Sequence, residues 1–157
     1  MKSELAPVSF WGLVFAGLLG FCLVFASSAL AADGALKLEV QLLWGTNDSK
    51  SPDPKHKPVE PEVKKKLAVL PLKFSNYFEV NRKVLEIANG ASRKEELSDK
   101  CIVEIKNCGR SKVEVSLIGA GQQVVKQSQN LPKGEALVVA GNAPNATAWL
   151  VFVKRVD

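Results

Sequence analysis

Alternating apolar and polar residues dominate the chain after residue 35. Residues 36–42 place leucine or valine at every second position, which is the period of a strand with one buried face. The same alternation runs through residues 112–118. Residues 101–107 precede it across the Gly109-Arg110 turn, so these two segments are predicted to form an antiparallel hairpin. Residues 146–153 are apolar almost throughout, which is typical of a strand covered on both faces in the middle of a sheet.

Shorter segments predict further strands, bounded by glycine, proline and asparagine. They are residues 74–80, 84–87, 123–129 and 136–140. Residues 92–97 are too polar for a central strand, so an edge strand or a loop is expected there.

One helix is predicted over residues 61–70. Pro61 suits the first helical position, and Val63, Leu67 and Leu70 form an apolar stripe that can lie on a sheet. Pro71 prevents the helix from continuing.

These elements predict an all-β fold, an antiparallel β-sandwich with an immunoglobulin-like arrangement and one short helix before the second strand. The turns are too short for parallel crossovers, which need a dozen residues or more. The Cys…Trp…Cys pattern of true immunoglobulin domains is absent from the sequence. A small β-barrel is the alternative.

The first 31 residues have the pattern of a signal peptide. Residues 6–31 carry no charge, and Ala29 and Ala31 place small residues where a signal peptidase cleaves. We therefore expect a secreted or periplasmic protein with a single domain at residues 32–157, including a Pro/Lys-rich loop and short helix at 45–71. A stretch this long can also span a bilayer, so anchoring by residues 6–31 is the alternative.

The positive charge of the chain is concentrated in one segment. The formal net charge is +5, and residues 50–73 contain seven lysines against three acidic residues. A patch that binds anionic lipid or polysaccharide is one interpretation, and a solvated helix face is the other. The candidate residues are Lys50, Lys55, Lys57, Lys64, Lys65 and Lys66.

Two cysteines follow the predicted signal peptide, and the predicted strand geometry argues against a disulfide bond between them. Cys101 and Cys108 lie seven residues apart on one predicted strand, which separates them by about 23 Å, whereas a disulfide needs Cα atoms within about 7 Å. We expect a buried thiol at Cys101 and a turn thiol at Cys108, which is a candidate for pairing with another molecule.

The residue types needed for catalysis or metal binding are sparse. The chain has one histidine, His56, placed between two lysines in a predicted loop, so no familiar zinc or copper site is expected. Glu95, Glu96 and Asp99 are the carboxylates that a hydrolase would use, but basic neighbours favour a solvated turn. We therefore predict no catalytic residues, no metal, no cofactor and no nucleic-acid partner.

Three stretches carry a family resemblance. Residues 71–80 after the predicted helix, 131–135 before a strand, and 147–153 near the end resemble, in that order behind a signal peptide, small secreted bacterial β-domain proteins with no assigned activity. The resemblance implies an exported β-domain and supplies no functional residue.

The expected function is an exported, non-catalytic binding or structural module of the cell envelope or extracellular space, whose partner is unknown. Tyr77, Trp44 and Trp149 are candidate aromatic anchors for a protein partner, although each also suits a core. The alternatives are the basic patch of residues 50–73 and, less favoured, a carboxylate-based hydrolase.

Overall fold

The structure is a computed structural model that describes residues 34–143 and 147–157. Within these residues it has the following elements: β1 (Leu36–Thr46), β2 (Lys57–Pro58), α1 (Pro61–Ala68), β3 (Asn76–Ile87), β4 (Ser92–Ser98), β5 (Cys101–Asn107), β6 (Lys112–Gly119), β7 (Gln122–Asn130), β8 (Ala136–Ala143) and β9 (Thr147–Arg155). The predicted leader at residues 1–31 lies outside the described residues. No helix in the described part of the chain is long and apolar enough to cross a membrane.

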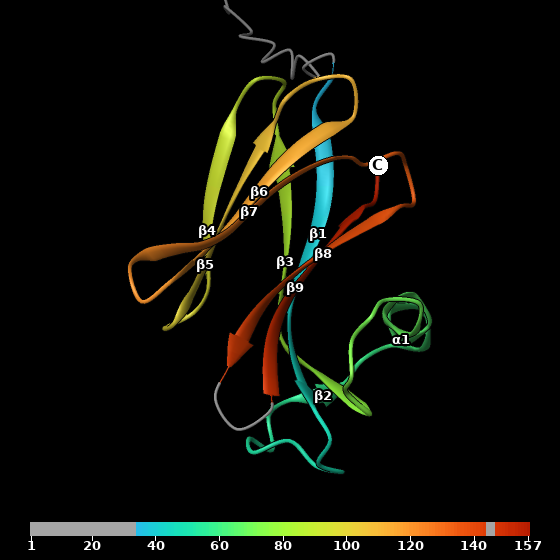
Figure 1. Cartoon of the computed structure of the whole chain (residues 1–157). Coiled ribbons are helices and arrows are strands. Elements are labelled where there is room, and N and C mark those ends of the chain that lie inside the picture. Colours follow the sequence, from blue (N-terminus) through green and yellow to red (C-terminus); the bar gives the residue numbers. More distant parts are fainter. Residues whose placement is uncertain (1–33, 144–146) are drawn as a thin grey trace, which may run out of the picture.

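Two antiparallel sheets face each other in two layers (Figure 1). The larger sheet has the strand order β2-β3-β1-β9-β8, and the smaller sheet is the meander β4-β5-β6-β7. The sheets do not close into a barrel, so the predicted antiparallel β-sandwich is confirmed.

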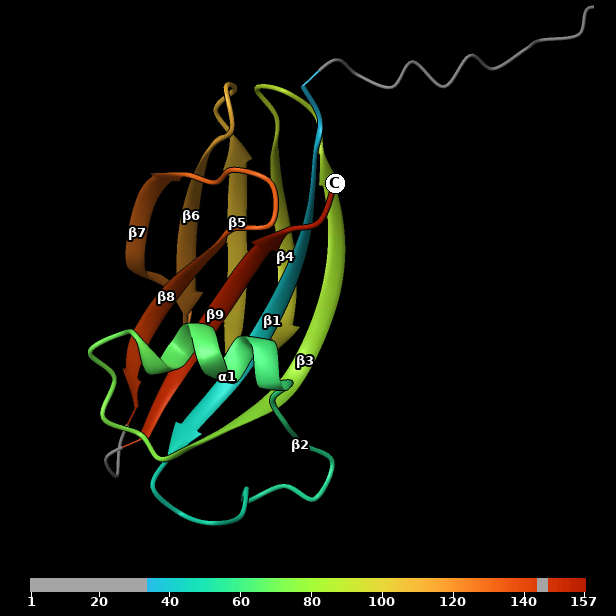
Figure 2. The ribbon, with the colours of Figure 1, turned by 90° about the vertical axis from the view of Figure 1, so that its right-hand side faces the viewer.

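The almost continuously apolar segment near the end of the chain is central in the larger sheet. β9 pairs with β1 on one side and with β8 on the other. The smaller sheet covers its inner face, and α1 lies across its outer face (Figure 2). The prediction of a strand covered on both faces is confirmed.

The apolar faces predicted from the alternation meet between the two sheets. Leu38 and Val40 of β1, Val103 of β5 and Val115 of β6 are all 0 % exposed in one cluster that unites both layers. A second cluster lies under the helix, where Val63 and Leu67 of α1 pack on outward-facing residues of the larger sheet. The sheet residues are Leu43, Tyr77, Ala148, Leu150 and Phe152.

Two predicted strands, residues 74–80 and 84–87, are one strand in the structure. β3 runs without a break from Asn76 to Ile87 and pairs with β1 over its whole length. The register passes from Asn81 to Glu79, so Val80 is an extra residue that bulges the strand. The polar residues between the two segments hid this continuity, because they interrupt the apolar pattern while their backbone still pairs.

The short strand β2 lies in the segment that was predicted to be a Pro/Lys-rich loop, and the other boundaries differ by a few residues. The polar residues 92–97 form the edge strand β4, and the helix ends at Ala68, two residues earlier than predicted.

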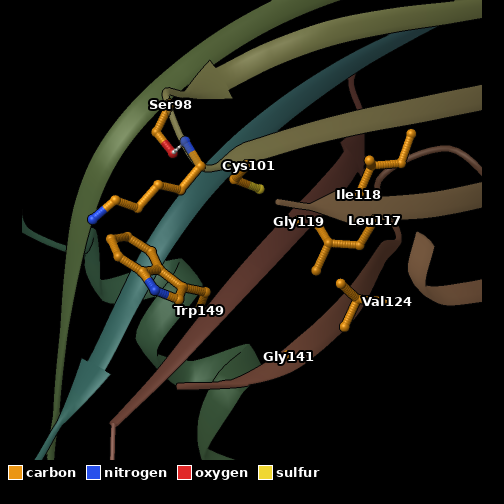
Figure 3. A pocket seen from close by; sticks show the side chains of 9 residues that line it. Ser98, Cys101, Leu117, Ile118, Gly119, Val124, Gly141 and Trp149 are labelled. Atoms are coloured by element: carbon orange, nitrogen blue, oxygen red, sulfur yellow. Dashed lines mark hydrogen bonds between the residues drawn. The ribbon is translucent and has the colours of Figure 1, made fainter. Parts of the chain in front are cut away.

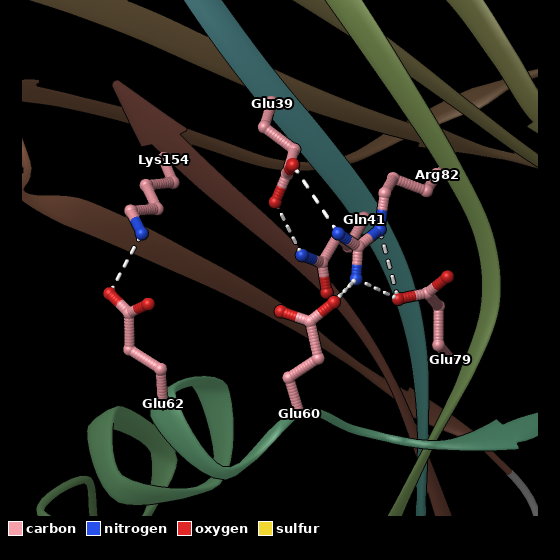
Figure 4. Close-up of polar contacts among 7 residues, drawn as sticks. All are labelled: Glu39, Gln41, Glu60, Glu62, Glu79, Arg82 and Lys154. Carbon is pink, nitrogen blue, oxygen red and sulfur yellow. Dashed lines mark hydrogen bonds and ion pairs between the residues drawn. The ribbon is translucent and has the colours of Figure 1, made fainter. Parts of the chain in front are cut away.

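An ion-pair network fixes the start of α1 to the larger sheet (Figure 4). The Arg82 guanidinium on β3 lies 2.6 Å from a carboxylate oxygen of Glu79, 2.7 Å from Glu60 and 3.4 Å from Glu39. Hydrogen bonding to Glu79, with a further bond to Glu60, raises the pKa of Arg82, which therefore stays charged. Since Glu60 directly precedes α1, this network sets where the helix begins on the sheet.

Candidate binding site

The six lysines of the predicted anionic-ligand patch do not converge. They are Lys50, Lys55, Lys57, Lys64, Lys65 and Lys66, and all except Lys66 are exposed. The burial of Val63 and Leu67 fixes how α1 is rotated on the sheet. With about 100° between successive residues, Lys65 faces away from the sheet and Lys64 and Lys66 leave the helix on opposite flanks.

The flanking lysines have separate surroundings. Lys66 Nζ lies 3.2 Å from the Gly134 carbonyl oxygen and 3.9 Å from a Glu135 carboxylate oxygen, next to β8. Lys64 lies beside Asn76 at the opposite flank, where β3 begins. The structure therefore brings no compact cationic site together from these residues.

The cysteines have the predicted environments. Cys101 is buried, Cys108 is exposed, and both are free thiols. Burial raises the pKa of the Cys101 thiol to about 11, so this thiol is neutral at physiological pH. The exposure of Cys108 suits the predicted intermolecular thiol, which stays a prediction.

His56 is less solvated than the sequence suggests. Its side chain is 12 % exposed, a 2.6 Å hydrogen bond joins its Nδ1 to Ser51 Oγ, and its Nε2 lies 3.9 Å from Asp53 Oδ2. These contacts span only six residues. The distance to Asp53 exceeds hydrogen-bond length, so the carboxylate does not orient the imidazole as a catalytic triad requires. The arrangement stabilises the loop.

The remaining titratable candidates are dispersed. Glu95 forms a 3.7 Å ion pair with Lys83, while Glu96 and Asp99 are exposed. Among the described residues, no group of three His, Cys, Asp or Glu side chains is placed to hold a metal ion.

Two of the three candidate aromatic anchors meet in the structure. Trp44 of β1 and Trp149 of β9 are register partners, and their ring centroids lie 4.5 Å apart in an edge contact. Both continue the inward-facing rows of the larger sheet, yet both are only half-buried, whereas Val151 and Val153 on the same face are 0 % exposed. Tyr77 is different: it is buried under α1 and belongs to the core.

A cavity of about 110 Å³ opens beside Trp149. We call it the tryptophan cavity, and its lining residues are Ser98, Lys100, Cys101, Leu117, Ile118, Gly119, Val124, Gly141 and Trp149. It lies where β5 starts and β6 ends, since Cys101 and Gly119 are register partners. Figure 3 shows Cys101, Val124 and Trp149 arranged around a common space.

The lining is apolar with a polar margin. Lys100 is the only residue in it that is charged at neutral pH, because the Cys101 thiol keeps its proton. Ser98 Oγ accepts a 3.3 Å hydrogen bond from the Lys100 backbone N–H, which leaves the hydroxyl proton available. Such a site suits a small ligand with an apolar body and one anionic or polar group.

Sequence reasoning identified Trp44, Trp149 and Cys101 as noteworthy residues, but it missed Val124 and Gly141. One weak signal was present, because Gly141 follows a predicted apolar strand, and a strand glycine often marks a bulge or the close approach of a ligand or another backbone. No signal in the sequence connected β8 with the turn after β6.

No protein-family model, no curated protein and no solved structure matches the chain.

Proposed function

We propose that the protein is an exported, non-catalytic binding module of the cell envelope or extracellular space, and that its ligand binds at the tryptophan cavity. The observation that carries this proposal is the contact between Trp44 and Trp149 at the open end of the sandwich, next to an apolar hollow.

The exposure of these residues supports a binding role. Trp44 and Trp149 are half-buried, whereas Leu42 and Val151, two positions away on the same face of the larger sheet, are 0 % exposed, and Val124 across the cavity is 54 % exposed. Covering such surface is favourable by about 25 cal/mol for each Å² of apolar area removed from water. A ligand bound here covers the apolar surface that the smaller sheet leaves exposed.

The basic-patch alternative has weaker support. Its lysines leave the molecule in different directions, and Lys66 already contacts Gly134 and Glu135. Charges spread in this way attract anions without forming a site of defined geometry.

The test uses protein labelled with fluorotryptophan and fractions of the native host's envelope and culture medium. Fluorine NMR resolves each indole, and the Trp44→Phe and Trp149→Phe variants assign the signals of these two residues. We expect at least one fraction to shift the Trp149 signal saturably.

Two matched variants test whether the shift of the Trp149 signal arises from binding at the cavity. Val124→Asp places a charge at the cavity, and Val84→Asp places one on β3, where the valine is equally exposed at 55 %. The response should disappear in Val124→Asp and persist in Val84→Asp. No shift with any fraction, or equal shifts in both variants, would contradict the proposal.

A further inference from the structure

We infer that the tryptophan cavity binds the aliphatic chain of a short monocarboxylate, five to six carbons long in total, with its carboxylate at Lys100. This inference rests on the proposed binding function and assigns the chemical class of the ligand.

The size of the cavity limits the apolar part of the ligand. A protein cavity of about 150 Å³ accommodates benzene, which corresponds to about 25 Å³ per carbon. At that ratio the observed 110 Å³ holds four to five carbons. Pentanoate and hexanoate have chains of this length beyond the carboxyl carbon.

The walls favour an aliphatic chain over a polar one. Leu117, Val124 and Trp149 supply apolar surface, and the buried thiol of Cys101 behaves as a small apolar group. A sugar or another polyhydroxylated ligand would leave hydroxyl groups without partners against these walls, which is costly.

The charge at the margin favours an anionic head group. Lys100 is exposed and forms no ion pair among the described residues, and the Ser98 hydroxyl is a second donor beside it. The nearest acidic residue along the chain, Asp99, is exposed and is not part of the lining. The polar end of the cavity therefore presents donors and a positive charge, which match a carboxylate.

Gly141 allows the cavity to be made smaller without strain. A Cβ atom at this position would lie 3.5 Å from Leu117 Cδ2 and 3.9 Å from Val124 Cγ1, which are ordinary van der Waals distances. The Gly141→Ala variant thus adds one methyl group to the wall and should leave the fold intact.

The first experiment is a titration with straight-chain carboxylates from propanoate to decanoate, read from the fluorotryptophan signal of Trp149. Affinity should rise by about fourfold per methylene up to pentanoate or hexanoate and then stop rising. Half-saturation is expected on the order of 1 mM for so small a ligand. In Gly141→Ala the rise should stop one methylene earlier.

The second experiment tests the head group. Hexanoate should bind more tightly than hexanamide, and hexylamine should bind most weakly. Lys100→Gln should reduce the preference for hexanoate over hexanamide by about two- to fivefold, as expected for an exposed ion pair. The control Lys133→Gln removes the same charge in the exposed turn between β7 and β8, at the other end of the sandwich, and should leave the preference unchanged.

The outcomes separate this inference from the proposed function. If host fractions shift the Trp149 signal and no carboxylate does, the binding function stands and the carboxylate assignment is wrong. Affinity that keeps rising through decanoate, or that is the same for hexanoate and hexanamide, also overturns the assignment. If carboxylates bind equally well to Val124→Asp, the cavity is not their site and the carboxylate assignment is wrong, while the proposed function is still decided by the host fractions.

Discussion

Two glycines within strands show how the atoms around a residue decide whether it can be replaced by alanine. Gly45 of β1 and Gly141 of β8 both have ordinary strand backbone without positive φ. A Cβ atom at Gly45 would lie 3.0 Å from Phe74 Cδ2 and 3.2 Å from Leu150 Cδ1. An alanine at Gly45 therefore crowds Phe74 and Leu150, whereas an alanine at Gly141 makes only ordinary contacts.

Alanine substitution should separate the two positions. Gly45→Ala is expected to lower the free energy of unfolding by about 1–3 kcal/mol, because the added methyl group overpacks the cluster around Leu150. Gly141→Ala is expected to leave it unchanged or raise it by up to about 1 kcal/mol, since alanine restricts the unfolded chain. Urea denaturation of both variants measures this, and equal losses would contradict the packing argument.

The buried thiol of Cys101 makes stability depend on pH in the alkaline range. Its pKa in the folded protein is raised to about 11, whereas an unfolded cysteine ionises near about 8.5. Between these values the unfolded chain loses a proton that the folded chain keeps, so unfolding becomes more favourable. The stabilising contribution is complete below the unfolded pKa and is lost as the pH rises through the folded pKa.

The free energy of unfolding of the wild type should therefore fall more steeply between about pH 8 and pH 10.5 than that of Cys101→Val. Cys108→Ala should retain the steep fall, because Cys108 is exposed. Denaturant titrations at several pH values measure these slopes. Parallel slopes for wild type and Cys101→Val would show that the thiol is not buried.

At the scale of elements, α1 depends on the sheet beneath it. The helix has only eight residues, and isolated helices shorter than about 12 residues are marginal in water. Burial of Val63 and Leu67 and the ion pairs of Arg82 supply the missing stability.

Arg82→Met should therefore loosen the helix. Glu39 and Glu79, with side chains 21 % and 19 % exposed, would lose their cation, at an expected cost of about 1–3 kcal/mol. Faster hydrogen exchange at the amides of α1 measures the effect. The control Lys154→Met removes the exposed pair with Glu62 and should cost less than about 0.5 kcal/mol. Unchanged exchange in Arg82→Met would contradict this role of the network.

The two edges of the smaller sheet are protected unequally. β4 carries several charged residues, whereas β7 is exposed along nearly all of its nine residues and has one charge, Lys126, paired with Glu114 at 2.9 Å. Uncharged, exposed edges are templates for pairing with another chain.

Lys126→Val should therefore promote self-association through β7, with a sedimentation coefficient that rises with protein concentration. The matched variant Lys94→Val on β4 should stay monomeric at the same concentrations, because neighbouring charges still protect that edge. Equal behaviour of the two variants would show that the charge on β7 is not protective.

At the scale of the whole molecule, the two sheets differ in extent. The larger sheet continues past the smaller one at the end where β1 finishes and β9 begins (Figure 1). Its inward-facing rows end there with the half-buried Trp44 and Trp149, and residues next to the turns after β4 and β6 line the cavity beside Trp149. The cavity is a consequence of this difference.

The proposed export through a cleaved signal peptide predicts a mature chain with a defined first residue. Protein recovered from outside the cytoplasm should have the intact mass of residues 32–157. The Ala29→Asp, Ala31→Asp double variant should accumulate at full length, because a signal peptidase requires small residues at these positions. An exported wild-type protein that retains residue 1 would support the anchored alternative.

The sequence by itself determined the helix and most of the strands, together with the face that each buries, but it did not reveal the short strand β2. Periods of two and of about 3.6 residues are local properties, so segments such as residues 36–42 and 61–68 reveal their buried sides without any partner. The continuity of β3 was missed because its polar middle is paired and neutralised by residues distant in sequence.

Only the tertiary structure decided where a ligand can bind. Trp44 and Trp149 meet because the first and last long strands pair with each other, and the cavity beside them exists because β5 and β6 stop short of that pair. Strand register and the relative extent of two sheets arise from contacts between distant segments, which no local pattern of hydrophobicity encodes.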